Sequence, residues 1–274
     1  MSGKLIVVGT PIGNLGDLSP RAAEALGAAD FIAAEDTRVT LKLLNHLGLK
    51  KPLISYYEHN KREKGTLICR RILEGETCVL VSDAGMPAIS DPGEDLVRQC
   101  AEAGVEVTVV PGPSAFVSAL ALSGLPTGRF TFEGFLSMNR KNRREHLAEL
   151  QNERRTLIFY EAPHKLPATL KDLLAALGDR RIALVRELTK VHEEVVRTTL
   201  REAAARYEVE TPRGEFVLVV EGAAQSEGEE PTTLEEAVER ARRLMEGGAS
   251  ASEAAKRAAA GTGHKKGEIY RALF

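Results

Sequence analysis

Val81-Ser82-Asp83-Ala84-Gly85-Met86-Pro87-Ala88-Ile89-Ser90-Asp91-Pro92-Gly93 follows an apolar run at residues 78–81 and precedes a helically spaced segment at residues 94–103. The apolar run predicts a buried parallel strand, so the quoted stretch is a strand-to-helix loop. Its two Asp, two Gly and two Pro bend the backbone tightly and expose amides beside carboxylates. Open α/β sheets bind ligands at such strand ends, although glycine and proline could serve here only to turn the chain.

The composition is that of a folded globular protein, with 43% hydrophobic and 28% charged residues among 274. Apolar runs reach only about six residues, and the chain begins without a signal-peptide core, so we expect a cytoplasmic protein with no membrane segment. The three cysteines, Cys69, Cys78 and Cys100, lack paired spacing and predict core thiols rather than a disulfide or metal site. A net charge of −2 leaves any nucleic-acid affinity to local basic patches.

Strand and helix patterns alternate through the first 124 residues. Strands are predicted at 5–8, 31–34, 53–57, 78–81 and 105–110, and helices at 21–28, 41–47, 60–73 and 94–103. This alternation predicts a five-stranded, doubly wound parallel sheet. The loop at residues 9–14 is rich in glycine but lacks G-x-G-x-x-G, and the chain has no G-x-x-x-x-G-K-[ST]. The sequence therefore argues against NAD and ATP as ligands.

Glycine and proline at residues 123–128 mark a domain boundary. Beyond it, strands are predicted at 130–135, 156–160, 182–186, 194–197 and 215–220, and helices at 142–150, 163–177 and 200–207. An acidic linker at 225–231 leads to three short helices at 234–245, 251–259 and 265–273, which resemble a helix-turn-helix unit. The predicted domains are 1–124, 125–224 and 232–274.

Five ordered motifs carry a resemblance to a known family. They are Gly9-Thr10-Pro11-Ile12-Gly13-Asn14-Leu15, Glu35-Asp36-Thr37-Arg38, residues 82–93, Pro111-Gly112-Pro113-Ser114-Ala115 and Phe159-Tyr160-Glu161-Ala162-Pro163-His164. The chain resembles the tetrapyrrole methylase superfamily over nearly its whole length. The resemblance implies an α/β fold of a parallel and a mixed-sheet domain, S-adenosylmethionine in the cleft between them, and a homodimer. Within the superfamily, the chain is similar to enzymes that methylate a cytidine 2′-oxygen of 16S rRNA, on the small ribosomal subunit.

The resemblance places the cofactor on strand-end loops. A sulfonium and an ammonium group favour carboxylates and backbone donors over lysine and arginine. A helix that starts near Ser114 would offer amides to the cofactor carboxylate. Ser114 itself could contact the cofactor, cap that helix, or do both. The segment 186–190 also matches the family, with cofactor, RNA and an internal ion pair left open as partners. The residues assigned to the cofactor are Pro11, Gly13, Asp83, Ala84, Gly85, Met86, Ser114, Ala115, Tyr160, Glu161, Glu215 and Phe216.

Methyl transfer to a ribose hydroxyl needs alignment first and a general base second. Glu35 and Asp36 follow a strand beside the expected methyl site, and Arg38 could hold a carboxylate or an RNA phosphate. Alternatively, Asp36 caps the next helix while Glu35 pairs with Arg38. His164 is the second choice of base.

Basic clusters predict where RNA would bind. They contain Lys61, Arg62, Arg140, Lys141, Arg143, Arg144, Lys265 and Lys266. Each cluster could instead be a solvated helix face. Two other functions remain open at this point: a tetrapyrrole C-methyltransferase, and a ribosome-binding assembly factor without catalysis.

Overall fold

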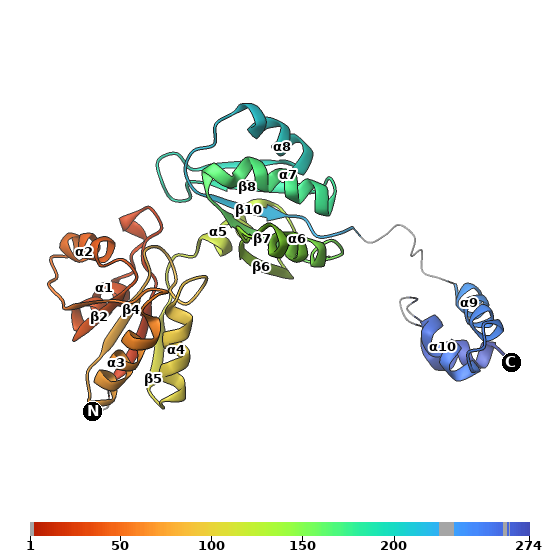
Figure 1. Cartoon of the computed structure of the whole chain (residues 1–274), viewed down its shortest axis with the longest axis horizontal. Helices are drawn as coiled ribbons and strands as arrows, with labels where there is room; N and C mark the ends of the chain where they lie inside the picture. Colours follow the sequence, from red (N-terminus) through yellow and green to blue (C-terminus); the bar gives the residue numbers. More distant parts are fainter. Residues whose placement is uncertain (1–2, 225–232, 260–261, 263) are drawn as a thin grey trace. The chain divides into compact units, whose positions relative to one another are not determined.

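A computed structural model describes residues 3–224, 233–259, 262 and 264–274 (Figure 1). It divides the chain into two compact units, residues 1–222 and 223–274. The predicted linker at 225–231 lies outside the described residues, as do residues 260, 261 and 263.

The first sheet of the larger unit is wholly parallel. Its strands are β1 (Lys4–Val8), β2 (Phe31–Ala34), β3 (Leu53–Ser55), β4 (Cys78–Val81) and β5 (Glu106–Val110), in the order β3-β2-β4-β1-β5. Every strand therefore ends at the same edge, where the loops rich in glycine, proline and charge gather. This arrangement confirms the predicted parallel sheet.

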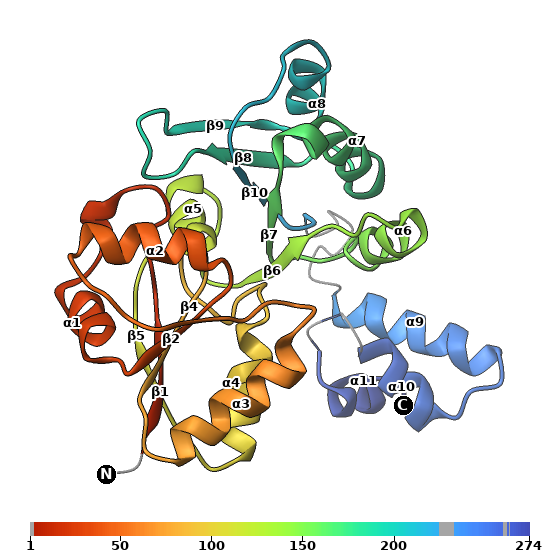
Figure 2. The ribbon, with the colours of Figure 1, turned by 60° about the vertical axis from the view of Figure 1, so that its left-hand side comes forward.

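Helices cover both faces of this sheet (Figure 2). The helices are α1 (Pro20–Ala28), α2 (Thr37–His46), α3 (Lys61–Leu73) and α4 (Gly93–Glu102). Successive strand residues point to opposite faces, so Ile6 and Val8 pack with α1 and α2, whereas Leu5 and Val7 pack with α3 and α4. The cysteines are buried on the second of these faces, with Cys69 Sγ 3.2 Å from Cys100 Sγ, which confirms them as core thiols.

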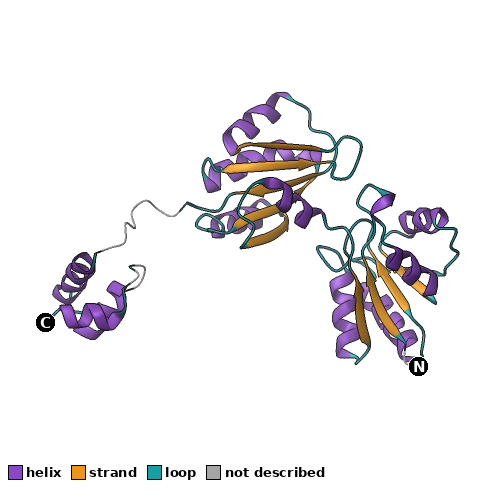
Figure 3. Cartoon of the chain, turned by 180° about the vertical axis from the view of Figure 1, so that it is seen from behind, coloured by secondary structure: helices purple, strands orange, loops and turns teal. Residues whose placement is uncertain are grey.

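The second sheet is mixed. Figure 3 draws the strands of both sheets in orange. Its strands are β6 (Phe130–Phe135), β7 (Thr156–Glu161), β8 (Arg181–Arg186), β9 (Glu194–Thr199) and β10 (Phe216–Val220). The order is β6-β7-β10-β8-β9, and only β6 and β7 run parallel. Helices α6 (Arg140–Glu149), α7 (Leu166–Leu177) and α8 (Leu200–Val209) contribute to the core on one face.

Helix α5 (Ala115–Ser123) packs on the opposite face of the second sheet. Its Ala119 and Leu120 join Ile158 and Val217 in one buried cluster. Thus α5 packs with the second sheet, although it precedes the boundary predicted near residue 124. The division into 1–124 and 125–224 stays a prediction.

Several predicted helix starts differ from the structure. Helix α2 begins at Thr37 rather than at residue 41, because Asp36 caps it. Helix α6 begins two residues earlier than predicted, because the Asn139 side chain accepts hydrogen bonds from the amides of Lys141 and Asn142. The segment predicted as one helix from 163 is a 3₁₀ turn, Pro163–Lys165, followed by α7. Each element carries a proline in its first turn, where a missing amide proton costs little.

The smaller unit has three helices among its described residues: α9 (Leu234–Glu246), α10 (Ala251–Ala259) and α11 (Lys266–Ala272). They pack around a core made mostly of alanine, with Val238 and Ile269 as its larger members. Thr233 and Glu236 form a capping box that starts α9. Within the described ranges, no helix combines the length and apolar character needed to cross a membrane.

Candidate functional site

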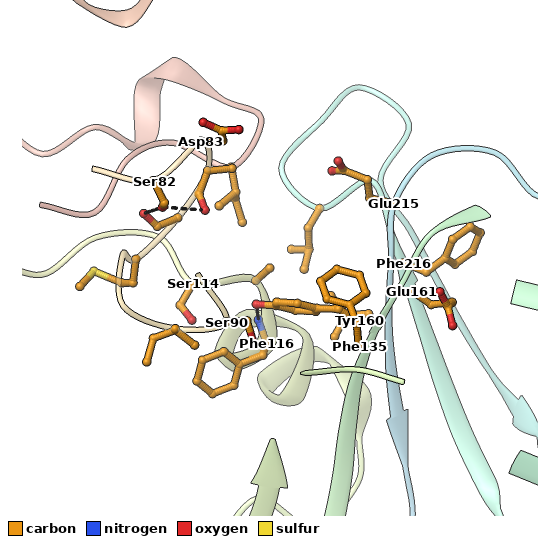
Figure 4. A pocket seen from close by; sticks show the side chains of 18 of the residues that line it. Ser82, Asp83, Ser90, Ser114, Phe116, Phe135, Tyr160, Glu161, Glu215 and Phe216 are labelled. Atoms are coloured by element: carbon orange, nitrogen blue, oxygen red, sulfur yellow. Dashed lines mark hydrogen bonds between the residues drawn. The ribbon is translucent and has the colours of Figure 1, made fainter. Parts of the chain in front are cut away.

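A pocket of about 530 Å³ lies within the larger unit (Figure 4). One wall consists of the segments that follow β1, β2, β4 and β5. The other consists of residues in β6, β7, β8 and β10, and of residues that follow β7 and β8 or precede β10. The volume is within the range of small-molecule sites. Residues 82–86 and 89–91 line the pocket, so the loop singled out in the sequence does form part of a cavity.

Backbone contacts hold this loop against its neighbours. Thr10 and Gly85 exchange hydrogen bonds, with N···O distances of 3.0 and 3.1 Å. Gly9 and Gly112 meet so closely that a Cβ on Gly9 would lie 2.7 Å from the Cα of Gly112. The amide of Gly112 donates to Met86 Sδ at 3.2 Å. Glycine at both positions therefore lets the loops after β1 and β5 approach each other.

The first wall carries three carboxylates, Glu35, Asp83 and Asp91. Burial raises the pKa of Glu35, and the negative charges of Asp83 and Asp91 raise it further. Burial also raises the pKa of Asp91. The concentration of negative charge suits a cationic ligand, because a nearby positive charge would stabilise all three carboxylates.

Asp91 also shapes the loop that carries it. Its Oδ1 accepts hydrogen bonds from the amides of Ala88, at 3.0 Å, and Gly93, at 2.7 Å. Ala88 and Ser90 adopt φ angles of 66° and 62°, in the left-handed region that non-glycine residues rarely occupy. Such strain persists where surrounding contacts impose it, and it is common at binding sites.

Asp36 and Arg38, two of the three predicted catalytic residues, lie outside the pocket lining, whereas Glu35 lines it. Asp36 caps α2 by accepting the Arg38 amide at 2.8 Å, and its carboxylate also binds the Arg38 guanidinium. These hydrogen bonds lower the pKa of Asp36 to about 2. The capping alternative therefore describes Asp36, but Arg38 pairs with Asp36 rather than with Glu35. The Asp36 amide in turn donates to Asp83 Oδ1 at 2.9 Å, which ties the β2 and β4 loops together.

The start of α5 faces the pocket. Ser114 is the N-cap residue by position, yet in the part of the chain that the structure describes its side chain makes no capping hydrogen bond. Two residues further on, the Phe116 amide donates to the Tyr160 hydroxyl at 3.3 Å. Ser114, Ala115 and Tyr160 all line the pocket, as predicted for cofactor residues. Burial raises the pKa of Tyr160, so its hydroxyl stays protonated at neutral pH.

Two residues of the second wall, Glu161 and Phe216, also contact other protein side chains. Glu161 lines the pocket, but it is buried and its carboxylate accepts hydrogen bonds from Thr169 Oγ1 and from the Ala162 amide. The Phe216 ring packs edge-on against Tyr207. Both residues line the pocket, so cofactor contact stays a prediction for them, and each also has a structural partner.

The segment 186–190 resolves into ion pairs at the pocket wall. Lys190 lines the pocket and its Nζ lies 2.9 Å from Glu187 Oε1 and 3.0 Å from Glu215 Oε2. Arg186 pairs with Glu194 at 3.1 Å. The internal ion pair, one of the three partners left open for this segment, is present in the structure, and contacts with cofactor or RNA stay predictions.

Several predicted residues lie elsewhere, and several lining residues were missed. Pro11 and Gly13 do not line the pocket, whereas Ile12 between them does. His164 is exposed and also lies outside the lining.

Several residues that line the pocket were not among the predicted site residues; they include Ser90, Asp91, Phe116, Phe135, Leu188 and Lys190. Asp91 lies in the loop first singled out in the sequence, so its carboxylate could have been predicted to line the pocket. Phe135 carried no such signal, because only the path of β6 brings it to the pocket.

The predicted RNA-binding residues fall into two groups. Lys61 pairs with Asp95 and Glu58, and Arg143 binds Asp172 and Thr169, so both join structural elements together. The remaining six are exposed: Arg62, Arg140, Lys141, Arg144, Lys265 and Lys266. Arg140, Arg143 and Arg144 also line a groove of about 670 Å³ between α6 and α7.

Comparison with known proteins gives consistent matches. Residues 4–204 match the family described as Tetrapyrrole (Corrin/Porphyrin) Methylases. A Synechocystis protein named Ribosomal RNA small subunit methyltransferase I is 46% identical over 271 residues, which cover 98% of this chain and 96% of that protein. A protein of the same name from Halalkalibacterium halodurans is 47% identical over 270 residues, covering 98% and 93%.

Solved structures share the fold at low sequence identity. One is the crystal structure of uroporphyrin-III C-methyltransferase from Thermus thermophilus complexed with S-adenyl homocysteine, with a TM-score of 0.55 and 22% identity. The match covers 79% of this chain and 97% of that chain, so it spans both sheets. With a family match over most of its length and relatives at nearly half identity, the chain belongs to the tetrapyrrole (corrin/porphyrin) methylase family.

Proposed function

We propose that this protein transfers a methyl group from S-adenosylmethionine to the ribose 2′-oxygen of a cytidine in 16S rRNA. The observation that carries the proposal is the 46% identity, over 98% of the chain, to a protein named Ribosomal RNA small subunit methyltransferase I. The alignment covers 96% of that protein, so the two chains correspond over nearly their full lengths. The function implied by the sequence motifs is the same.

The pocket fits the proposed cofactor by its chemistry. Glu35, Asp83 and Asp91 supply negative charge for a sulfonium and an ammonium group, and the first turn of α5 supplies amides for a carboxylate. Ile12, Met86 and Leu188 supply apolar surface. We assign the cofactor to this pocket, with Asp83, Gly85, Ser114 and Tyr160 as its principal protein partners.

When bound, S-adenosylmethionine supplies the methyl group, and its sulfur leaves as a thioether when the 2′-oxygen forms the new C–O bond. The protein must orient the 2′-hydroxyl and accept its proton. Glu35 is the proposed base, because it lines the pocket and its raised pKa brings its proton affinity closer to neutral pH. Alignment can contribute roughly 7–11 kcal/mol, and the base about 10²- to 10⁴-fold in rate.

Asp36 and Arg38 act on this chemistry indirectly in the proposal. Their ion pair, together with the Asp36–Asp83 hydrogen bond, holds the strand-end loop that carries Glu35. The exposed basic residues of α3, α6 and α11 are the proposed RNA contacts. We further propose a cytoplasmic homodimer that acts on the small ribosomal subunit.

The test is transfer of a tritiated methyl group from S-adenosylmethionine to isolated 30S particles that lack the modification, followed by nuclease mapping. Label in one 2′-O-methylated cytidine of 16S rRNA supports the proposal. Label in uroporphyrinogen III but not in RNA would instead support a tetrapyrrole C-methyltransferase. Binding to 30S particles without label in either substrate would support an assembly factor.

A further inference from the structure

We propose that Phe135 is a stacking platform for the base of the nucleotide that receives the methyl group. The inference rests on the proposed RNA substrate. Phe135 is the last residue of β6, it lines the pocket, and 57% of its surface is exposed. Its ring centroid lies 5.5 Å from that of Tyr160, and Figure 4 shows the two rings beside each other. The side chain thus has one face in the protein and a large surface toward the pocket and solvent.

A β-bulge places Phe135 there. Phe132 pairs with Ile158, but the next pairs are Gly134 with Phe159 and Phe135 with Tyr160, so Glu133 is the additional residue. Phe132 points toward α5, where its ring stacks on Phe116 at 4.5 Å. In a regular strand Phe135 would point the opposite way, toward the face covered by α6, α7 and α8. The bulge reverses this and turns the ring to the pocket face.

The bulge also meets the strained loop after β4. Gly134 has a φ of 62°, and a Cβ at this position would lie 3.1 Å from Ser90 Oγ. Ser90 itself has a φ of 62° and lines the pocket. Two left-handed residues, one in β6 and one in the loop after β4, therefore meet where Phe135 is presented. Bulges next to a binding site commonly serve to aim one side chain.

The chain after Phe135 provides the complementary charge for RNA. Met138 is 76% exposed, and α6 begins at Arg140, within about 17 Å of Phe135 along the chain. Arg143 fixes α6 to α7 through Asp172 and Thr169, which leaves Arg140, Lys141 and Arg144 exposed on an anchored helix. An exposed ring followed by cations is the composition of single-stranded RNA sites, where bases stack and phosphates meet Lys and Arg.

The experiment compares Phe135→Ala, Phe135→Leu and Phe135→Tyr with wild type in steady-state methylation of unmodified 30S particles. We expect Phe135→Ala to raise KM for the particles about tenfold, the order expected from losing one stacking ring. Calorimetry should give an unchanged Kd for S-adenosylmethionine. Leucine keeps apolar bulk without a π face and should resemble alanine, whereas tyrosine should restore wild-type KM. Phe130→Ala is the matched control, since Phe130 is 39% exposed on the same strand but outside the pocket lining.

The outcomes separate this inference from the proposed function. An unchanged KM in Phe135→Ala, with an active wild type, would overturn the inference alone. A weaker cofactor Kd in Phe135→Ala would overturn it too, because the ring would then belong to the cofactor site. Absence of transfer to 30S particles by wild type would reject the proposed function, and the inference with it.

Discussion

Glu35 is placed where its ionised form is unfavourable. Burial raises its pKa most, followed by the charges of Asp83 and Asp91. Asp36, the next residue, has the opposite environment, because Arg38 lowers its pKa to about 2. Two adjacent carboxyl groups thus differ in proton affinity, and such a difference often separates the residue that exchanges a proton from the residue that holds structure.

Glu35→Gln should reduce kcat about 10²-fold or more, because an amide cannot accept the 2′-hydroxyl proton. Cofactor affinity should change much less. Asp36→Asn is the matched comparison, since it neutralises the adjacent carboxylate outside the pocket, and its loss of kcat should be far smaller. Single-turnover methylation of 30S particles measures both variants. Equal losses in the two variants would contradict the assignment of the base to Glu35.

The same Glu35→Gln variant should be more stable than wild type at about pH 8. A carboxyl with a raised folded-state pKa contributes stability below its unfolded pKa, and this contribution is lost as the pH rises through the folded pKa. Glutamine stays neutral, so the variant keeps that stability at alkaline pH. Urea unfolding across a pH series should show a difference that grows as pH rises. A constant difference would place its origin in packing instead.

Asp83→Asn should weaken S-adenosylmethionine binding while the loop keeps its shape. In the wild type the Asp36 amide donates to Asp83 Oδ1 at 2.9 Å. Asparagine keeps an oxygen that can accept this hydrogen bond, so the substitution removes only the charge. We expect Kd to rise roughly fivefold to tenfold, since a partly screened opposite charge near 4 Å is worth about 1 kcal/mol or slightly more. Calorimetry with Asp17→Asn, an exposed carboxylate outside the pocket lining, controls for net charge. Equal affinities in the two variants would remove Asp83 from the site.

At the scale of the elements, the pocket depends on irregular backbone within regular strands and loops. The bulge in β6, the turn held by Asp91 and the close approach of Gly9 to Gly112 all lie in or next to segments that line the pocket. The regular strands form a rigid scaffold, and these irregular backbone segments set the direction of individual side chains at the pocket.

Gly134→Ala should destabilise the larger unit by about 1–2 kcal/mol, because alanine disfavours a left-handed φ. The added Cβ would also press on Ser90 Oγ, which lies 3.1 Å from its position. Gly128→Ala is the control, since its Cβ would meet nothing within 4 Å and its φ lies outside the left-handed region. Urea unfolding of both variants gives the comparison. A Gly134→Ala protein as stable as the control would show that the bulge relaxes freely.

At the scale of the whole molecule, the two units have separate cores. Residues 232–274 contain eight Lys or Arg and six Glu, a slight positive excess. Their described helices share a core of their own, made mostly of alanine. In contrast, all the described residues that line the pocket belong to the larger unit. Cofactor binding is therefore expected to be independent of the smaller unit.

Truncation after residue 231 should leave the Kd for S-adenosylmethionine unchanged and reduce methylation of 30S particles. Residual binding should also depend less on salt, because fewer phosphate contacts release fewer counterions. Calorimetry and a salt series of particle binding measure the two effects. Full methylation with an unchanged salt slope would place the RNA contacts wholly in residues 1–222.

The amino-acid sequence by itself determined the fold class and the family. Apolar runs of strand length, separated by helical periods, predict the parallel sheet because buried parallel strands exclude polar side chains on both faces. Loops with glycine, proline and aspartate at the strand ends then predict where the site lies. Most cofactor residues chosen from those loops do line the pocket, including Asp83, Ser114 and Tyr160.

Only the tertiary structure decided which of these side chains face the pocket. Asp36 and Glu35 are adjacent in sequence, yet a helix cap engages one carboxylate and partial burial raises the pKa of the other. Phe135 reaches the pocket because one additional residue in β6 reverses its direction. Side-chain periodicity reports the usual direction along a strand, but bulges and long-range hydrogen bonds alter that direction through contacts between distant segments.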